Sequence, residues 1–178
     1  MQKKNLKNYR LVIYVLVICA IFSAMIFIVS TPVFVWHRKA VCKSRIETLG
    51  KAMLIYAGDY DEVYPTADKW CDLLIEQTSV NRHQGITKKD FKCPANTKAR
   101  CSYAINPNVS PRSNPRLVLL FETKGGWNQF GGAELLSAEN HKGKGCNVLF
   151  CDLHVEFIKA EGFGQLKWGS EINDKPIR

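Results

Sequence analysis

The chain has 178 residues, with 25 basic and 16 acidic side chains and a formal net charge of +9. The charge is uneven, because residues 1–46 contain eight basic side chains and the first acidic residue is Glu47. The remaining residues contain 17 basic and 16 acidic side chains and are nearly neutral. This distribution removes the main argument for a basic domain that binds nucleic acid, and no nucleic-acid partner is expected.

An uncharged apolar segment at residues 11–36 separates two basic clusters. A helix of roughly 20 apolar residues crosses the core of a membrane, so a transmembrane helix is predicted here, preceded by a basic tail at residues 1–10. A cleavable signal peptide would have an apolar stretch of about 7–15 residues and small residues at the cleavage site. This segment is longer and lacks such a site. The two flanks are similarly basic, so charge alone leaves the orientation open.

Apolar residues then recur at helical spacing from Val41 to Tyr60, which predicts that the helix continues to about residues 58–59. A second helix is predicted from a cap at Thr66 to about Thr78. Residues 79–116 are rich in proline, asparagine and serine and are expected to form loops.

Three strands are predicted in the second half of the chain, at residues 117–122, 147–151 and 154–159. Because helices precede strands, the expected fold is α+β, with the long helix packed on a small antiparallel sheet. The soluble domain would occupy residues 37–178, with its core at about 40–159 and a tail at 160–178.

A motif in residues 141–156, HKGKGCNVLFCDLHVE, resembles a known family. It is similar to the carboxyl-terminal motif of the bacterial pilin-like proteins named for H-X9-DG, which are related to type IV pilins and type II secretion pseudopilins. Shorter segments resemble the same family in the same order: YAGDY at 56–60 before YP at 64–65, FKCP at 91–94, SYAIN at 102–106, and a strand ending in Glu122. The resemblance marks five candidate residues, which are Glu122, His141, Asn147, Asp152 and His154.

The chain departs from the family pattern at two places, and each departure leads to a prediction. Ten residues instead of nine separate His141 from Asp152, and Leu153 replaces the turn glycine. Because leucine adopts a positive φ poorly, the turn is expected to be wider or the strands shifted. Prepilins are also cut after a glycine and carry a glutamate five residues later, whereas Gly50 is the first glycine here. An uncleaved, permanently anchored protein is therefore expected.

The resemblance implies a membrane-anchored, pseudopilin-like structural or interaction protein, associated with a type II secretion or type IV pilus-like system. Its location would be the bacterial inner membrane, with a cytoplasmic amino terminus and a periplasmic domain that contacts protein partners. The chain has no nucleophile elbow and no phosphate-binding glycine loop. No enzyme activity, catalytic residue or small-molecule substrate is predicted.

The alternative function is an exported metal- or ligand-binding module. Glu122, His141, Asp152 and His154 would converge as nitrogen and oxygen ligands, and Cys146 or Cys151 could add thiolates. Because the chain lacks Cys-x-x-Cys and His-Glu-x-x-His motifs, no cofactor is predicted. In the simpler interpretation, His141 and Asp152 hold the loop and hairpin by hydrogen bonds.

Six cysteines follow the apolar segment, and export would permit disulfides. Cys93 and Cys101 are the first candidate pair, because they bracket a short loop. Cys146 and Cys151 are five residues apart on a predicted strand and would face opposite sides of the sheet. The other interpretation is that some of the cysteines are small buried residues.

Overall fold

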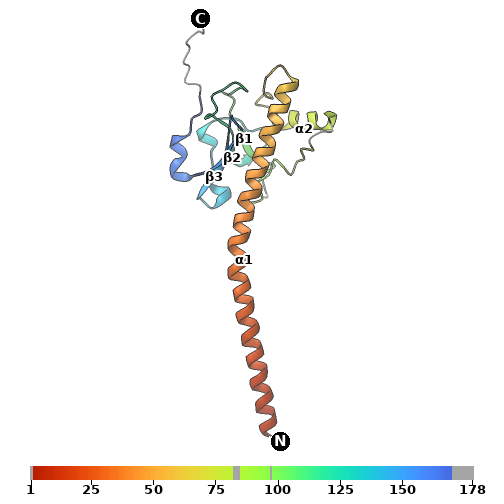
Figure 1. Cartoon of the computed structure of the whole chain (residues 1–178), viewed down its shortest axis with the longest axis vertical. Coiled ribbons are helices and arrows are strands. Elements are labelled where there is room, and N and C mark those ends of the chain that lie inside the picture. The colour runs from red at the N-terminus through yellow and green to blue at the C-terminus, as the bar shows by residue number, and fades with distance from the viewer. Residues whose placement is uncertain (1, 82–84, 97, 170–178) are drawn as a thin grey trace. The chain divides into compact units, whose positions relative to one another are not determined.

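The computed structural model describes residues 2–81, 85–96 and 98–169 (Figure 1). The chain divides into two compact units, Met1–His37 and Arg38–Arg178. Helix α1, Gln2–Asp59, contributes residues to both units. In the first unit, Tyr9–Ile28 has a mean hydropathy of 3.0, and its length and composition are those of a membrane span or a signal anchor.

The second unit has an α+β fold, as predicted. The strands among its described residues form one antiparallel sheet in the order β1-β2-β3-β4. The elements are α2 (Trp70–Asn81), β1 (Cys101–Ile105), β2 (Val118–Gly126), β3 (Gly145–Phe150) and β4 (Val155–Lys159), with 3-10 helices η1 (Ala133–Leu135), η2 (Glu139–His141) and η3 (Ala160–Gln165).

The sequence did not predict β1, which lies in the segment expected to form loops. All five of its residues are buried. A buried strand shows no apolar–polar alternation, and one this short cannot be recognised by periodicity. Helix α2 begins at Trp70, later than the predicted cap at Thr66.

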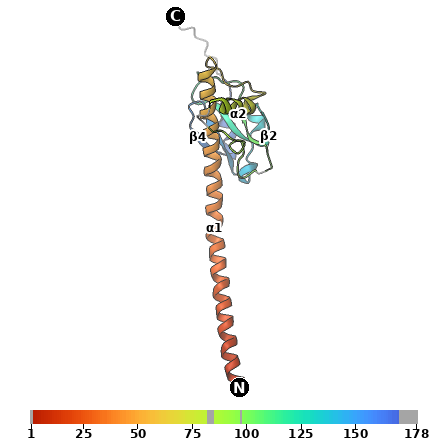
Figure 2. The same cartoon turned by 90° about the vertical axis from the view of Figure 1, so that its right-hand side faces the viewer.

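Within the second unit, the last turns of α1 and helix α2 cover one face of the sheet (Figures 1 and 2). Residues 38–59 of α1 bring their apolar stripe onto this face. Gly50 permits close packing, since a Cβ atom there would lie 2.3 Å from Cδ2 of Leu149. We call this face the helix-side core; it includes Ile46, Leu49, Met53, Trp70, Leu74, Phe91, Tyr103, Leu120 and Leu149.

The opposite face is covered by segments around η1 and η3. Its buried residues are Ala104, Val118, Phe121, Cys146, Val148 and Phe150. Trp168 packs edge-on against Phe121, with ring centroids 4.8 Å apart. Residues 160–168, predicted to begin a tail, therefore complete this core, whereas 170–178 lie outside the described residues.

The hairpin between β3 and β4 has the wider turn expected from Leu153. The Phe150 N–H donates to the His154 carbonyl at 3.0 Å, and the Leu153 N–H donates to the Phe150 carbonyl at 2.9 Å. The loop thus contains three residues, and Leu153 takes the left-handed position at φ 66°. Packing of the Leu153 side chain against the helix-side core offsets the cost of this backbone conformation.

A large loss of stability is expected for Gly145→Ala at the start of β3. Gly145 has φ 147°, and a Cβ atom there would lie 2.1 Å from the backbone oxygen of Ile158. Because backbone cannot move aside as a side-chain tip can, the free energy of unfolding should fall by about 3 kcal/mol. Urea unfolding of the full chain in detergent, followed by tryptophan fluorescence, measures it. Gly164→Ala is the control, since no atom lies within 4 Å of its Cβ position; equal midpoints for the two variants would contradict the expectation.

Candidate functional site

The candidate site is built around Glu122, a carboxylate with no exposed surface in the middle of the sheet. Strand β2 places it there because side chains alternate between the two faces. Phe121 packs in the core opposite the helices, so Glu122 points to the helix side. Phe121 is paired with Val148, which brings Asn147 opposite Glu122 on the neighbouring strand.

Three donor groups surround the Glu122 carboxylate. The backbone N–H of Asn147 donates to Oε2 at 3.1 Å, and its side-chain Nδ2 donates to Oε1 at 3.1 Å. Nε2 of His141 lies 2.9 Å from Oε2 and 3.2 Å from Oε1. This polar cluster compensates the cost of burying a carboxylate, which is high when no partner is present.

The chain turn after η2 positions His141. The next residue, Lys142, is left-handed at φ 58°, and the Gly143 N–H donates to the Ala138 carbonyl at 3.0 Å. Nδ2 of Asn140 donates to the Thr123 carbonyl at 3.0 Å and ties η2 to β2. These hydrogen bonds fix the backbone around His141 and so position its imidazole, and the His141 side chain is 3% exposed.

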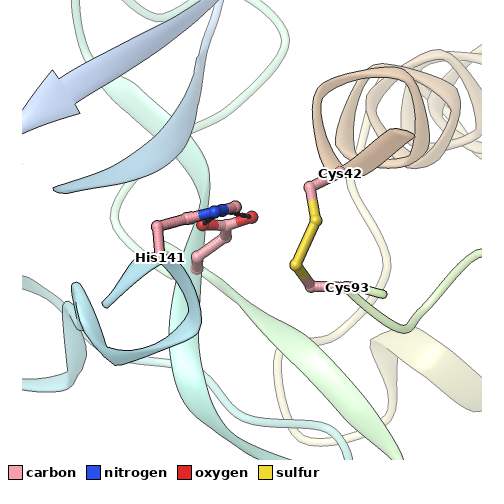
Figure 3. Close-up of side chains that lie close together, drawn as sticks. Cys42, Cys93 and His141 are labelled. Atoms are coloured by element: carbon pink, nitrogen blue, oxygen red, sulfur yellow. Dashed lines mark hydrogen bonds and ion pairs between the residues drawn. A yellow bond between two sulfur atoms is a disulfide. The ribbon is translucent and has the colours of Figure 1, made fainter. Parts of the chain in front are cut away.

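A disulfide between Cys42 and Cys93 lies beside this cluster. Cys42 comes from α1 and Cys93 from the loop before β1, and their side chains and the His141 ring lie close together (Figure 3). The two sulfur atoms, a Glu122 oxygen and a His141 nitrogen all lie within 4.8 Å of one another. Four buried residues from four separate segments thus converge on one point.

The predicted pairing of Cys93 with Cys101 is wrong. Cys101 is a buried thiol whose Sγ donates to the Tyr103 carbonyl at 3.3 Å. The Cys93 N–H instead donates to Ser102 Oγ at 2.9 Å, which fixes the loop while its sulfur bonds to Cys42. The short spacing suggested a local pair, but packing of α1 supplied a nearer partner from a distant part of the chain.

Two further contacts fasten α1 to this region. The Tyr103 hydroxyl donates to the Cys42 carbonyl at 3.3 Å, and Nη1 of Arg45 donates to the Lys92 carbonyl at 2.6 Å. Burial, and then the charge of Glu122, raises the pKa of Tyr103 well above its ordinary value. Tyr103 is therefore a neutral hydrogen-bond donor across the physiological pH range.

The structure divides the four predicted metal ligands into two pairs. Glu122 and His141 are in contact, but Asp152 and His154 form a second, half-exposed pair at the hairpin turn. The His154 N–H donates to Asp152 Oδ1 at 3.1 Å, and the His154 ring stacks on Phe150. Because a strand rises about 3.3 Å per residue, the hairpin turn lies more than about 10 Å along β3 from Asn147. The predicted four-residue site therefore does not form.

The predicted additional thiolates do not complete the site either. Cys146 packs in the core on the opposite face of the sheet, and Cys151 packs on the helix side, so the two face opposite ways as expected. Cys151 directly follows β3 and lies at the hairpin turn beside Asp152, and burial raises the pKa of its thiol to about 11. Cys42 and Cys93 were not predicted to belong to the site, because no local spacing in the sequence connects them with it or with each other.

Comparisons of the chain with protein-family models, with curated proteins and with solved structures give no match. The chemistry of the site is therefore interpreted from its geometry. It offers two sulfurs, one imidazole nitrogen and a carboxylate in a desolvated setting, with amide donors behind the carboxylate. Such a group can stabilise the fold, undergo thiol–disulfide chemistry or bind a metal.

Proposed function

We propose that this protein is a membrane-anchored, pilin-like interaction protein whose α+β domain lies outside the cytoplasm. The observation that carries the proposal is the combination of an apolar helical segment, Tyr9–Ile28, with a disulfide in the α+β unit. Disulfides persist in oxidising compartments and are rare in the cytoplasm. With the amino terminus in the cytoplasm, the segment would deliver the domain to the periplasmic side of a bacterial inner membrane.

The proposed role is protein–protein contact within a type II secretion or type IV pilus-like assembly. The resemblance of residues 40–159 to pilin-like proteins supports this role, as does the near-neutral charge after residue 46. Connecting loops are the usual sites of recognition, and two loop-rich segments, 79–116 and 123–146, are the proposed contact surfaces.

Topology mapping tests the anchor directly. We expect the intact chain in the membrane fraction, and an alkaline phosphatase fusion to its carboxyl end to be active. Placing two charges in the span, as in Leu16→Arg with Phe22→Arg, should release the chain because charged side chains are costly in a membrane. Leu16→Ala with Phe22→Ala is the matched control and should stay in the membrane.

Two results would contradict the proposal. Amino-terminal sequencing that finds a mature chain beginning within residues 5–15 would refute the uncleaved anchor. If crosslinking in intact cells recovers no membrane or secretion partner, the interaction role is not supported. Both measurements use the full chain in its native membrane.

A further inference from the structure

We infer that Cys42, Cys93, Glu122 and His141 form a binding site for a zinc-class transition-metal ion when the disulfide between the two cysteines is reduced. The inference goes beyond the anchoring and interaction role. It rests on one geometric fact, which is that ligand atoms from all four side chains lie within 4.8 Å of one another and are buried. The metal ligands predicted from the sequence included two of these residues but neither of the two cysteines.

The donor set matches the preferences of such an ion. Zn²⁺ takes tetrahedral sets of thiolate, imidazole and carboxylate ligands, with bonds of about 2.3 Å to sulfur and about 2.0–2.2 Å to nitrogen and oxygen. These bonds place neighbouring ligand atoms about 3.3–3.8 Å apart. In this structure the four ligand atoms lie at most 4.8 Å from one another. This largest separation is within about 1.5 Å of the range expected around a bound ion. Side-chain rotation and the separation of the two sulfurs after reduction supply the required movement.

The surroundings hold the ligands in place as outer-shell groups do in metal sites. Both Glu122 oxygens accept hydrogen bonds from Asn147, which fixes the plane of the carboxylate. The Tyr103 hydroxyl holds the backbone at Cys42, and the Arg45 guanidinium binds the carbonyl next to Cys93. Because two thiolates and a carboxylate exceed the charge of a divalent ion by one, this guanidinium also offsets the remaining negative charge.

Reduction and metal binding convert the disulfide form into the metal-bound form in two steps. A phosphine reductant and one water molecule convert the disulfide to two thiols, and the phosphine becomes a phosphine oxide. Binding of Zn²⁺ then displaces the two thiol protons, one from each sulfur. In the reverse direction, a peroxide takes two electrons from the two thiolates and is reduced to water with two protons, while the sulfur–sulfur bond forms and the ion leaves.

Cobalt substitution of the full chain in detergent tests the site, since Co²⁺ reports its ligands by absorption. We expect phosphine-reduced protein to bind about one Co²⁺ per chain, with a thiolate charge-transfer band and the visible bands of tetrahedral cobalt. Zn²⁺ should displace it, and the oxidised protein should bind neither ion. Reduced protein that binds no Co²⁺ would overturn the inference, as would equal binding before and after reduction.

Variants identify the ligands. His141→Ala should weaken cobalt binding at least about tenfold, whereas His154→Ala, which changes the exposed histidine at the hairpin turn, should leave it unchanged. Cys42→Ser should weaken the charge-transfer band and change the wavelength of the visible bands. Because these bands depend on the ligands of the cobalt, the spectrum of a folded variant shows directly that a ligand has been lost. Circular dichroism confirms that each variant is folded. Equal affinities for His141→Ala and His154→Ala would assign the cobalt to another site and overturn the inference. Since binding is measured in detergent, its failure leaves the proposed anchoring role untouched.

Discussion

Replacing Cys42 and Cys93 together by alanine is expected to lower the free energy of unfolding by about 4 kcal/mol. The two cysteines are 51 positions apart, and a cross-link that closes a loop of this size restricts the unfolded chain by about that amount. In a domain of this length, the melting temperature should fall by roughly 10 °C. The measurement is chemical and thermal unfolding of the full chain in detergent, followed by tryptophan fluorescence in the presence of a chelator.

The chelator matters because a metal bound by the reduced chain would restore part of the stability. Cys151→Ala is the control, since it removes a half-buried thiol that forms no disulfide. The free energy of unfolding of this variant should fall by about 1 kcal/mol or less. Wild-type protein reduced by a phosphine should unfold like the double variant. If the double variant and the oxidised wild type have the same midpoint, the disulfide does not stabilise the domain.

Replacing Glu122 by alanine is expected to lower the free energy of unfolding by about 3–5 kcal/mol. The change removes the acceptor for both Asn147 donors and for His141, and leaves these groups buried without that partner. Glu122→Gln should cost less, because its amide oxygen can still accept one of these hydrogen bonds. Urea unfolding of the oxidised chain measures both changes.

Glu139→Gln is the matched control for charge. Glu139 pairs with Lys124 at 2.8 Å, but the two side chains are 65% and 74% exposed. An exposed pair contributes about 1 kcal/mol or less, so this variant should unfold close to the wild type. A similar small effect of Glu122→Ala would show that the buried cluster is not important for stability.

The order of the predicted elements could be taken from the sequence because their signals are local. The end of α1 near Asp59 follows from helical spacing followed by Pro65, and the strands around Glu122 and Asn147 follow from short apolar runs. The apolar segment of the first unit is recognised from its length and lack of charge. A wider turn at Leu153 was one of two expected outcomes, but Leu153 itself takes the positive φ that leucine was expected to avoid.

The complete site could not be predicted in the same way. Glu122, His141 and Asn147 were named as candidates from the resemblance, and the structure brings these three together. The approach of Cys42 and Cys93 depends on how α1 packs across the sheet, and no spacing in the sequence records that packing. Asp152 and His154 were included because they belong to the same motif, but β3 runs from Asn147 toward the hairpin turn and carries them away from Glu122.

The cross-link between Cys42 and Cys93 also has a consequence for the order in which the molecule matures. Both cysteines precede every strand of the sheet in the chain. Because a chain is synthesised from its amino terminus and folds as it emerges, both sulfurs are available before Glu122 and His141 have been added. Early exposure to an oxidant would form the disulfide, and the sheet would then assemble on a chain that is already cross-linked. If oxidation is delayed until the whole chain has emerged, the same sulfurs meet the carboxylate and the imidazole as free thiols. The timing of oxidation during biogenesis would therefore decide which form of the cluster the finished protein contains.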